Sequence, residues 1–291
     1  MRNIKVAATQ MKCSEDKQTN IERADRLVRQ AAGQGAQIIL LQELFETLYF
    51  CQKELPDYLC LATEIMENTA IQHFSKLAGE LGVVLPISFY EKKNQARFNS
   101  VAVIDADGIV LGVYRKTHIP DGPGYEEKYY FSPGDTGFKV WDTRYGKIGV
   151  GICWDQWFPE TARCMALMGA EMLLYPTAIG SEPFDSHYDS KDHWQTVMRG
   201  HSAANIMPVV ASNRIGMETI VDSTITFYGS SFITDNKGQF VEELDRETEG
   251  FLVAELDLAT YAAERAAWGP FRDRRPEKYG ALMTLDGATR P

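Results

Sequence analysis

The segment QIILLQ at residues 37–42 is the feature that most constrains how this chain can fold. It is apolar at nearly every position, which is typical of a strand whose sheet is covered on both faces. A second strand pattern covers residues 4–10. Between the two strands, apolar residues recur at helical spacing and are followed by glycines, which are typical helix stop signals. These apolar residues are Ile21, Ala24, Leu27, Val28 and Ala31. This order predicts an α/β fold.

The same alternation of strands and helices continues along the rest of the chain. Helices are expected at 63–81, 159–168 and 190–206, and strands at 83–89, 98–104, 109–115, 146–152, 171–175, 208–213, 227–234 and 250–256. The last two strands are expected to flank the turn at 235–238. Two long polar loops, 117–137 and 176–189, interrupt the order, and such loops inside a compact domain are usually functional. No linker, repeat or change of composition divides the chain, so we expect a single domain over residues 1–291, with a mixed sheet in two packed layers.

The charge balance argues against a nucleic-acid partner. The chain carries 30 basic and 40 acidic residues, a net charge of −10, and has no basic cluster before RDRR near its end. Binding to a phosphate backbone requires many lysines and arginines, whereas an acidic chain is compatible with a cationic substrate. No apolar stretch approaches the roughly 18 residues that a membrane helix needs, so we expect no membrane partner.

The cysteines and the N-terminal residues predict a cytoplasmic protein. The five cysteines are odd in number and form no CxxC pair, which argues against a disulfide framework or a zinc site and for a reducing compartment. Met1 leads almost directly into the first strand pattern, without the apolar core of a signal peptide.

Three residues with reactive or charged side chains each follow the end of a predicted strand. Glu43 follows QIILLQ, Lys116 follows IVLGVYR and Cys153 follows KIGVGI. Ligands of open α/β sheets bind beyond the carboxyl ends of the strands, so a base, a cation and a thiol are expected to meet there. Glu43 would take the thiol proton, and Lys116 would favour the thiolate. The pattern alone leaves a second interpretation open, in which Cys153 is a buried apolar residue and the other two form a structural ion pair.

Five motifs, in order, connect the chain to a known family. They are QELF at 42–45, YRKTHIPDGPGYEEKYYFSPGDTGF at 114–138, GVGICWDQWFPE at 149–160, WQTVMRGHSAAN at 194–205 and AAWGPFRDRRPEKYG at 266–280. Together they resemble the carbon–nitrogen hydrolase (nitrilase) superfamily, and the resemblance runs from the first strand to the end of the last motif. It implies a four-layer αββα sandwich with mixed sheets, and a hydrolase that acts on non-peptide carbon–nitrogen bonds.

The resemblance also implies roles for four residues. The Glu–Lys–Cys triad of the family falls on Glu43, Lys116 and Cys153, and its second glutamate falls on Glu127 rather than on Glu126. The thiolate is expected to attack the ureido carbon of a carbamoylated amine, while Lys116 and the backbone N–H after the cysteine stabilise the oxyanion. No metal and no organic cofactor are implied.

The implied reaction is hydrolysis of N-carbamoylputrescine to putrescine, carbon dioxide and ammonia through an S-carbamoyl cysteine, as part of polyamine biosynthesis. The candidates for binding this substrate are Tyr49 and Trp154 along its methylenes, and Asp121, Glu182 and Asp185 at its ammonium. Each of these acids is more often a solvated loop charge than a ligand. The loop 176–189 holds no basic residue other than His187, which favours a cationic substrate.

Three alternatives stay open at this point. A β-ureidopropionase or an ω-amidase would use the same triad, with a basic residue facing the substrate's carboxylate, and a non-catalytic scaffold would bury Cys153 without acylating it. The resemblance further implies a homo-oligomer built from dimers, in which the segment 268–291 contacts a neighbouring subunit. Arg272, Arg274 and Arg275 alternate there with acidic residues and are expected to form an intersubunit network of salt bridges.

Overall fold

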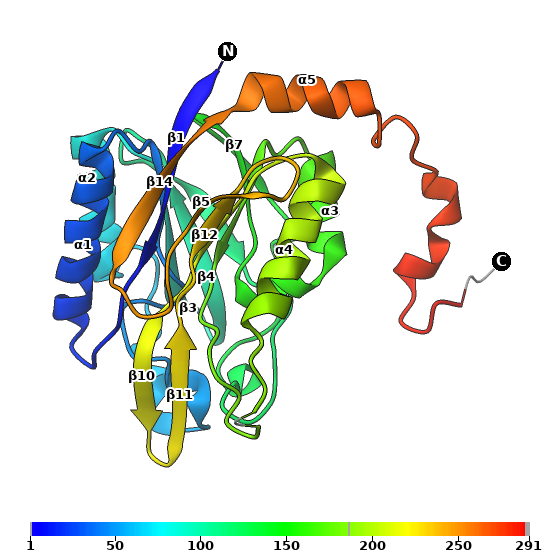
Figure 1. Ribbon diagram of the computed structural model, residues 1–291. Helices are drawn as coiled ribbons and strands as arrows, with labels where there is room; N and C mark the ends of the chain where they lie inside the picture. Colours follow the sequence, from blue (N-terminus) through cyan, green and yellow to red (C-terminus); the bar gives the residue numbers. More distant parts are fainter. Residues whose placement is uncertain (1, 186, 289–291) are drawn as a thin grey trace.

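Two β-sheets pack face to face in the computed structural model, which describes residues 2–185 and 187–288 (Figure 1). The first sheet has the order β14-β1-β2-β3-β4-β5, in which a parallel bridge between Ile38 and Val84 joins two three-stranded parts. Its strands are β1 (Asn3–Gln10), β2 (Ile38–Leu40), β3 (Leu85–Lys93), β4 (Ala96–Ile104), β5 (Val110–Arg115) and β14 (Gly250–Asp257). The second sheet has the order β13-β12-β9-β8-β7-β6. Its strands are β6 (Val140–Thr143), β7 (Gly146–Val150), β8 (Met172–Pro176), β9 (Val209–Ser212), β12 (Phe232–Thr234) and β13 (Phe240–Glu243).

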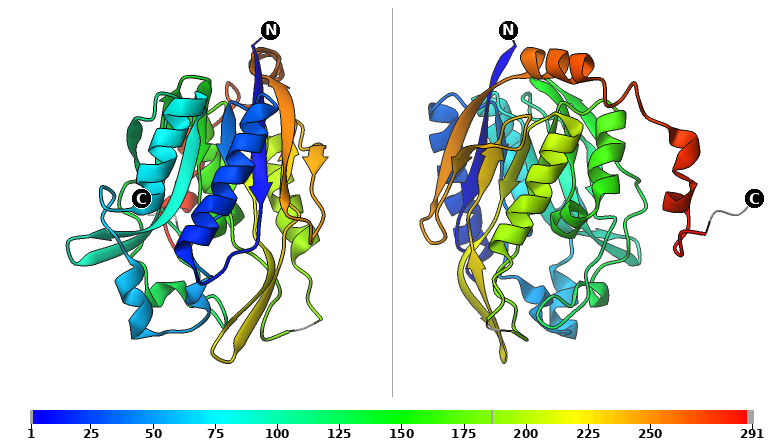
Figure 2. Two further views of the ribbon diagram at one scale, coloured as in Figure 1. Left: turned by 90° about the vertical axis from the view of Figure 1, so that its left-hand side faces the viewer. Right: turned by 45° about the vertical axis from the view of Figure 1, so that its right-hand side comes forward.

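Helices cover the outer face of each sheet, as Figure 2 shows from two sides. The helices are α1 (Lys17–Gly33), α2 (Thr69–Leu81), α3 (Pro159–Leu167), α4 (Lys191–Asn205) and α5 (Leu258–Trp268). α1 and α2 pack on the first sheet, and α3 and α4 pack on the second. The fold is therefore the four-layer αββα sandwich that the resemblance implied. Within the described part of the chain, no helix is both long and apolar enough to cross a membrane.

Alternation along the strands builds three buried layers. In β1, Val6 and Ala8 lie in the central layer between the sheets, whereas Ala7 lies in the layer under α1 and α2. In β8, Leu174 lies in the central layer and Leu173 lies under α3 and α4. Because both faces of each sheet are covered, the inner strands are apolar at nearly every position. That property made them recognisable in the sequence.

The helix expected at 63–81 begins later than the apolar pattern indicated. α2 begins at Thr69, because the side chain of Asn68 accepts a hydrogen bond from the backbone N–H of Ile71 (2.8 Å) and caps the helix. The residues before Asn68 form a bridge and a turn instead.

The strand expected at 227–234 is divided between two sheets. β11 (Ser223–Tyr228) pairs with β10 (Ile215–Ile220) in a hairpin of its own, whereas β12 pairs with β9. The turn at 235–238 therefore joins β12 to β13, and not to the strand at 250–256 as expected. Neither β10 nor α5 was predicted, because β10 buries a glutamate among its apolar residues and α5 buries only one side chain.

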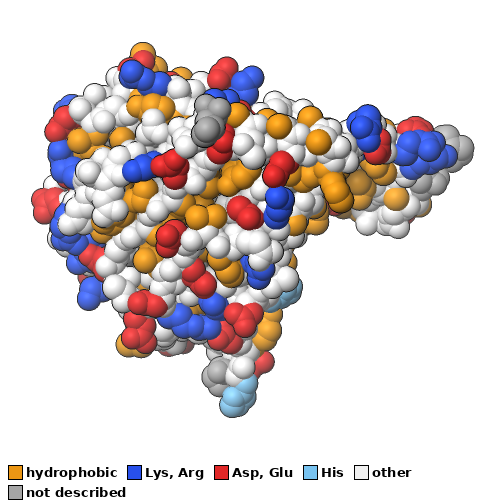
Figure 3. Space-filling model, turned by 45° about the horizontal axis from the view of Figure 1, so that its top comes forward, with side chains coloured by type: hydrophobic (Ala, Val, Ile, Leu, Met, Phe, Trp, Pro, Cys, Tyr) orange, Lys and Arg blue, Asp and Glu red, His pale blue; other side chains and the backbone are white. Residues whose placement is uncertain are grey.

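The C-terminal segment leaves the body of the molecule. α5 lies across one end of the sandwich (Figure 1), and residues 269–288, here called the arm, follow it. Phe271 still packs against the layer under α3 and α4, and the rest of the arm extends away from the body (Figure 3). Apolar side chains are exposed along this part of the chain, with Trp268 80% and Met283 85% exposed. Residues 289–291 of the segment expected to contact a neighbouring subunit lie outside the described residues.

Candidate active site

Lys116 is the centre of a buried charge cluster. Its ammonium donates hydrogen bonds to Glu43 Oε1 (2.9 Å) and to Glu127 Oε2 (2.7 Å). All three side chains are completely shielded from solvent. Glu43 follows β2 and Lys116 follows β5, so the first sheet delivers both, while Glu127 begins a short 3-10 helix inside the long loop after β5.

Cys153 comes from the second sheet, just after β7. Its backbone φ is 42°, a left-handed conformation that is uncommon for a residue with a Cβ and typical of functional turns. Asp155 holds this turn, because its buried carboxylate accepts hydrogen bonds from the backbone N–H of Ile152 (3.0 Å) and from the hydroxyl of Tyr114 (2.7 Å). The backbone N–H of His118 also donates to Asp155 (3.0 Å). Asp155 thus ties the cysteine turn to β5 and to the segment that follows it.

The surroundings of the Cys153 thiol favour its protonated form. Burial raises the pKa of Cys153 well above its ordinary value, and the neighbouring Glu43 carboxylate raises it further. The Lys116 ammonium lowers this pKa, as expected, but burial and Glu43 outweigh it. A thiol in this setting needs a base beside it at the moment of attack.

The charge cluster leaves one carboxylate oxygen free. Although burial opposes the charged form of Lys116, the carboxylates of Glu127 and Glu43 outweigh it and raise the pKa of Lys116. Burial also raises the pKa of Glu127, against the opposing effect of Lys116. Glu43 Oε1 accepts from Lys116 and from Asn99 Nδ2 (2.7 Å), whereas the buried Oε2 has no hydrogen-bond partner among the described residues. That second oxygen is available to accept a proton.

A cavity of about 370 Å³ opens onto Cys153. Aromatic and acidic side chains line it, and no lysine or arginine does so among the residues that the structure describes. The lining includes five residues that were not predicted: Tyr125, Trp157, Phe184, Tyr188 and His193. The arrangement offers a wall of rings with negative charge, next to a thiol and a buried base.

Most of the candidates for substrate binding lie at this cavity. It is lined by Tyr49, Trp154, Asp121 and Glu182. Tyr49 is also part of the charge cluster, because its hydroxyl donates to Glu127 Oε1 (2.7 Å). Burial raises the pKa of Glu182 above that of an ordinary glutamate.

Asp185 lies outside the cavity, contrary to the expectation for this residue. Its backbone N–H donates to the carbonyl of Glu182 (3.1 Å), and its exposed carboxylate accepts from the backbone N–H of His187 (3.0 Å). Asp185 is not among the residues that line Cys153's cavity. The two adjacent glutamates also differ, since Glu126 is half-buried and Glu127 is fully buried.

Asn99 is a residue of the site that sequence reasoning missed. It lies in β4 within the run FNSVAVI and donates to the Glu43 carboxylate. A polar side chain in a buried strand is costly unless it is hydrogen-bonded. An asparagine in a mostly apolar strand was therefore the signal available in the sequence.

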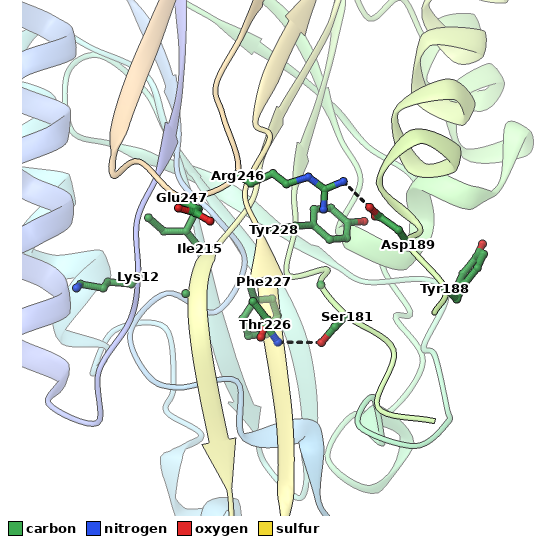
Figure 4. Close-up of a pocket in the computed structure, with 12 residues that line it drawn as sticks. Lys12, Ser181, Tyr188, Asp189, Ile215, Thr226, Phe227, Tyr228, Arg246 and Glu247 are labelled. Carbon is green, nitrogen blue, oxygen red and sulfur yellow. Dashed lines mark hydrogen bonds and ion pairs between the residues drawn. The ribbon is translucent and has the colours of Figure 1, made fainter. Parts of the chain in front are cut away.

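A second and larger cavity, of about 610 Å³, lies beside the β10–β11 hairpin (Figure 4). Arg246 pairs there with Asp189 (2.6 Å), and Lys12 and Glu247 also line it. No cysteine lines this cavity among the described residues. Its size therefore does not make it the catalytic cavity.

The described residues contain no group of three or more histidine, cysteine or acidic side chains arranged to hold a metal ion. All five cysteines are free thiols. His201, which lies on α4, is buried and hydrogen-bonded to the carbonyl of Gln156 (2.7 Å), as a structural histidine would be.

Known proteins resemble this chain over nearly its whole length. The carbon-nitrogen hydrolase family matches residues 5–266. The chain is 57% identical over 290 residues to N-carbamoylputrescine amidase of Arabidopsis thaliana, covering 98% of this chain and 97% of that protein. It is 56% identical over 283 residues to citrullinase of Francisella tularensis, covering 97% of this chain and 99% of that protein. A crystal structure of a carbon-nitrogen hydrolase from Helicobacter pylori G27 matches with a TM-score of 0.91 and 40% identity, covering 97% of this chain and 99% of that chain. This chain therefore belongs to the carbon–nitrogen hydrolase family, and it is a hydrolase of carbon–nitrogen bonds.

Proposed function

We propose that this chain hydrolyses N-carbamoylputrescine to putrescine, carbon dioxide and ammonia. The observation that carries the proposal is the lining of the cavity over Cys153, which combines carboxylates and aromatic rings without a lysine or arginine among the described residues. The substrate has a neutral ureido head, a chain of methylenes and a terminal ammonium. Carboxylates and ring faces both attract an ammonium, and the Arabidopsis relative is named for this activity.

Cys153 acts as the nucleophile and Glu43 as its base. Glu43 takes the thiol proton on its free oxygen, and the sulfur attacks the ureido carbon. Negative charge then develops on the ureido oxygen, where Lys116 and the backbone N–H of Trp154 stabilise it. One such donor contributes about 3 kcal/mol to lowering the barrier. The protonated Glu43 gives its proton to the departing ammonia, which leaves a carbamoyl group on the sulfur.

Water completes the reaction. Glu43 accepts a proton from a water molecule while the oxygen of that water attacks the carbamoyl carbon. Glu43 then returns the proton to the departing sulfur of Cys153. The product is an N-carboxy amine, which loses carbon dioxide to give putrescine. The atoms balance without a redox step or an organic cofactor. Glu127 holds Lys116 in place throughout by the hydrogen bond of 2.7 Å.

Glu182 is the acid that we assign to the distal ammonium. It lines the same cavity as Cys153, and it is half-buried, so water screens its charge less than that of the exposed Asp121. The rings of Trp154 and Tyr125 line the space that the methylenes would fill. An ammonium beside Glu182 would favour the ionised carboxylate, which burial alone disfavours.

A second candidate reaction is hydrolysis of citrulline. It is favoured by the 56% identity to the Francisella tularensis citrullinase. Citrulline also carries a ureido head, but its tail bears a carboxylate beside the ammonium. A buried carboxylate is usually matched by a cation, and the described lining offers no lysine or arginine. The cavity therefore supports the diamine derivative better.

Ammonia release from N-carbamoylputrescine, L-citrulline and N-carbamoyl-β-alanine, measured side by side, tests these alternatives. We expect the highest kcat/KM with N-carbamoylputrescine, no activity in Cys153→Ala, and full activity in the control Cys60→Ala, whose thiol is exposed and away from the cavity. A higher kcat/KM for citrulline would change the substrate and keep the nucleophile. Preference for the β-alanine compound would overturn the argument for a cationic tail.

We also propose that residues 1–291 form one hydrolase domain, which assembles as a homo-oligomer of dimers through segment 268–291. The exposed apolar side chains of Trp268 and Met283 support this, because such surfaces mark interaction sites. Light scattering should give fewer subunits per particle for a chain ending at residue 267 than for the full chain, and an equal number of subunits would contradict the proposal.

The free cysteines support a cytoplasmic location.

A further inference from the structure

A second buried ion pair, between Arg214 and Glu218, lies next to the charge cluster. Arg214 Nη1 donates to Glu218 Oε1 (2.8 Å), and both side chains are shielded from solvent. Arg214 immediately precedes β10 and Glu218 lies within it, so the pair belongs to a hairpin that is part of neither main sheet. Buried charges are costly to desolvate and need further hydrogen-bond partners. Those partners indicate what the pair holds.

Arg214 holds the turn that carries Glu43. Its Nη2 donates to the backbone carbonyls of Glu43 (3.0 Å) and Leu44 (2.6 Å), and its Nη1 donates to that of Thr47 (3.1 Å). The backbone at Leu44 is left-handed, with φ 48°, a conformation that persists only where the surroundings fix it. Three hydrogen bonds from one charged group therefore fix the backbone from which the Glu43 side chain projects.

Glu218 holds the segment that carries Tyr49. Its Oε2 accepts from the backbone N–H of Tyr49 (2.6 Å), and its carbonyl accepts from Gln52 Nε2 (3.1 Å). The Tyr49 hydroxyl in turn donates to Glu127, the carboxylate whose other oxygen binds Lys116. Glu218 is thus connected through one tyrosine to the second glutamate of the charge cluster.

We propose that Arg214 and Glu218 form a positioning pair, which sets the places of Glu43 and Glu127 around Lys116. The inference rests on the proposed function in one respect, that Glu43 is the base. Neither member of the pair lines the catalytic cavity in the described part of the chain, so the pair does not contact the substrate and acts mainly on the chemical step, through Glu43 and Glu127. A shift of about 1 Å at a reacting group costs about 10²-fold in rate.

Glu218→Gln is the sharpest test, because it keeps the size of the side chain and removes its charge. We expect kcat to fall by about 10²-fold, while KM changes much less than kcat. The control is Arg29→Gln on α1, which breaks two ion pairs of the exposed Arg29, to Asp25 at the same i,i+4 spacing (2.7 Å) and to Glu80 (2.7 Å). The control should keep both kcat and KM.

The rate at which iodoacetamide alkylates Cys153, followed by peptide mass spectrometry, gives a readout that does not depend on the substrate. Alkylation requires removal of the thiol proton, which we assign to Glu43, but no carbamoyl substrate, so it should slow in Glu218→Gln. If the wild type releases no ammonia from any carbamoyl amine but alkylation still slows in the variant, the proposed function fails and the positioning pair stands. A folded Glu218→Gln protein with wild-type kcat and alkylation rate would overturn the inference, and so would a loss confined to KM.

Tyr49→Phe serves as the test if Glu218→Gln does not fold, because it removes a single oxygen and keeps the ring. The Tyr49 hydroxyl stabilises the ionised Glu127, so its loss should raise the pKa of Glu127 and move the acid limb of the kcat profile to higher pH. A merely structural role would leave that profile in place. An unchanged profile would therefore overturn the path from Glu218 to Glu127.

Discussion

Ion pairs occur in two contrasting regions of this molecule, the charge cluster around Lys116 and the C-terminal arm. Lys116 contacts Glu43 at 2.9 Å with neither side chain exposed, whereas Arg272 contacts Asp273 at 2.8 Å with 69% and 63% of the side chains exposed. The distances are nearly equal, so geometry does not distinguish the pairs. Water does, because it screens the exposed charges and is excluded from the buried ones. Of these two regions, only the cluster would be left with uncompensated buried charge, and this would follow from the loss of Lys116.

Substitution of Lys116, the cation at the centre of the cluster, should have the largest effect on stability and activity. Lys116→Met leaves two carboxylates buried together, which should lower the free energy of unfolding by about 3–5 kcal/mol. The loss of an oxyanion donor should lower kcat by about 10²–10³-fold. Chemical denaturation and steady-state kinetics measure the two effects. A variant as stable as the wild type would contradict the view that these charges depend on one another.

Removal of the base alone should separate catalysis from stability. Glu43→Gln keeps the shape of the side chain and leaves Lys116 paired with Glu127, so the protein should lose less stability than Lys116→Met. Loss of a general base should lower kcat by about 10²–10⁴-fold. The matched control is Glu126→Gln, at the half-buried glutamate that precedes Glu127, and this variant should keep its activity. If both variants were equally active, Glu43 would not be the base.

An intermediate effect is expected at Glu182, which is only half-buried. Glu182→Gln should raise KM for N-carbamoylputrescine by about tenfold, since one hydrogen bond to a charged group contributes about 1.5–3 kcal/mol. Burial raises the pKa of Glu182, so this carboxylate takes up a proton at a higher pH than an exposed glutamate does. Wild-type KM should therefore rise as the pH falls through that raised pKa, whereas KM of the variant should stay flat. The same pH dependence in both proteins would count against this assignment.

The smallest effect is expected in the arm. Arg272→Ala removes an ion pair that water screens in the single chain, so the melting temperature of the unassembled protein should not change measurably. A clear decrease in the melting temperature would show that the arm pairs are buried in an assembly. The comparison between the two regions would then become one between two kinds of buried site.

The order of strands and helices was predictable because apolar side chains repeat with the period of each element. In α1, Leu27 and Val28 are buried as their spacing indicated. The β10–β11 hairpin was not predicted, because its buried positions include Glu218 and follow the buried Arg214. A pattern of hydrophobicity assigns such residues to the surface, and only partners distant in sequence explain their burial. Arg214 and the Glu43 carbonyl that it contacts are 171 positions apart.

The site was predictable to a different extent from the fold. Glu43, Lys116 and Cys153 could be found because each follows a strand, and the ends of strands are set by the fold. Asn99 could not be found this way, because its contact depends on the pairing of β4 with its neighbours. Asp185 was expected at the cavity but does not line it, and a local turn rather than the end of a strand fixes its backbone.

The division of the site between two sheets has a consequence for how the chain acquires activity during folding. Glu43 and Lys116 follow strands of one sheet and Cys153 follows a strand of the other, so the thiol meets its base only after the sheets have docked. The first sheet also requires both ends of the chain, since β1 pairs with β14 from Asn3 to Gln10. Contacts of such long sequence separation form slowly. Recovery of hydrolysis should therefore lag behind recovery of helix content in refolding, and a chain arrested with one finished sheet should have helices and strands but no turnover.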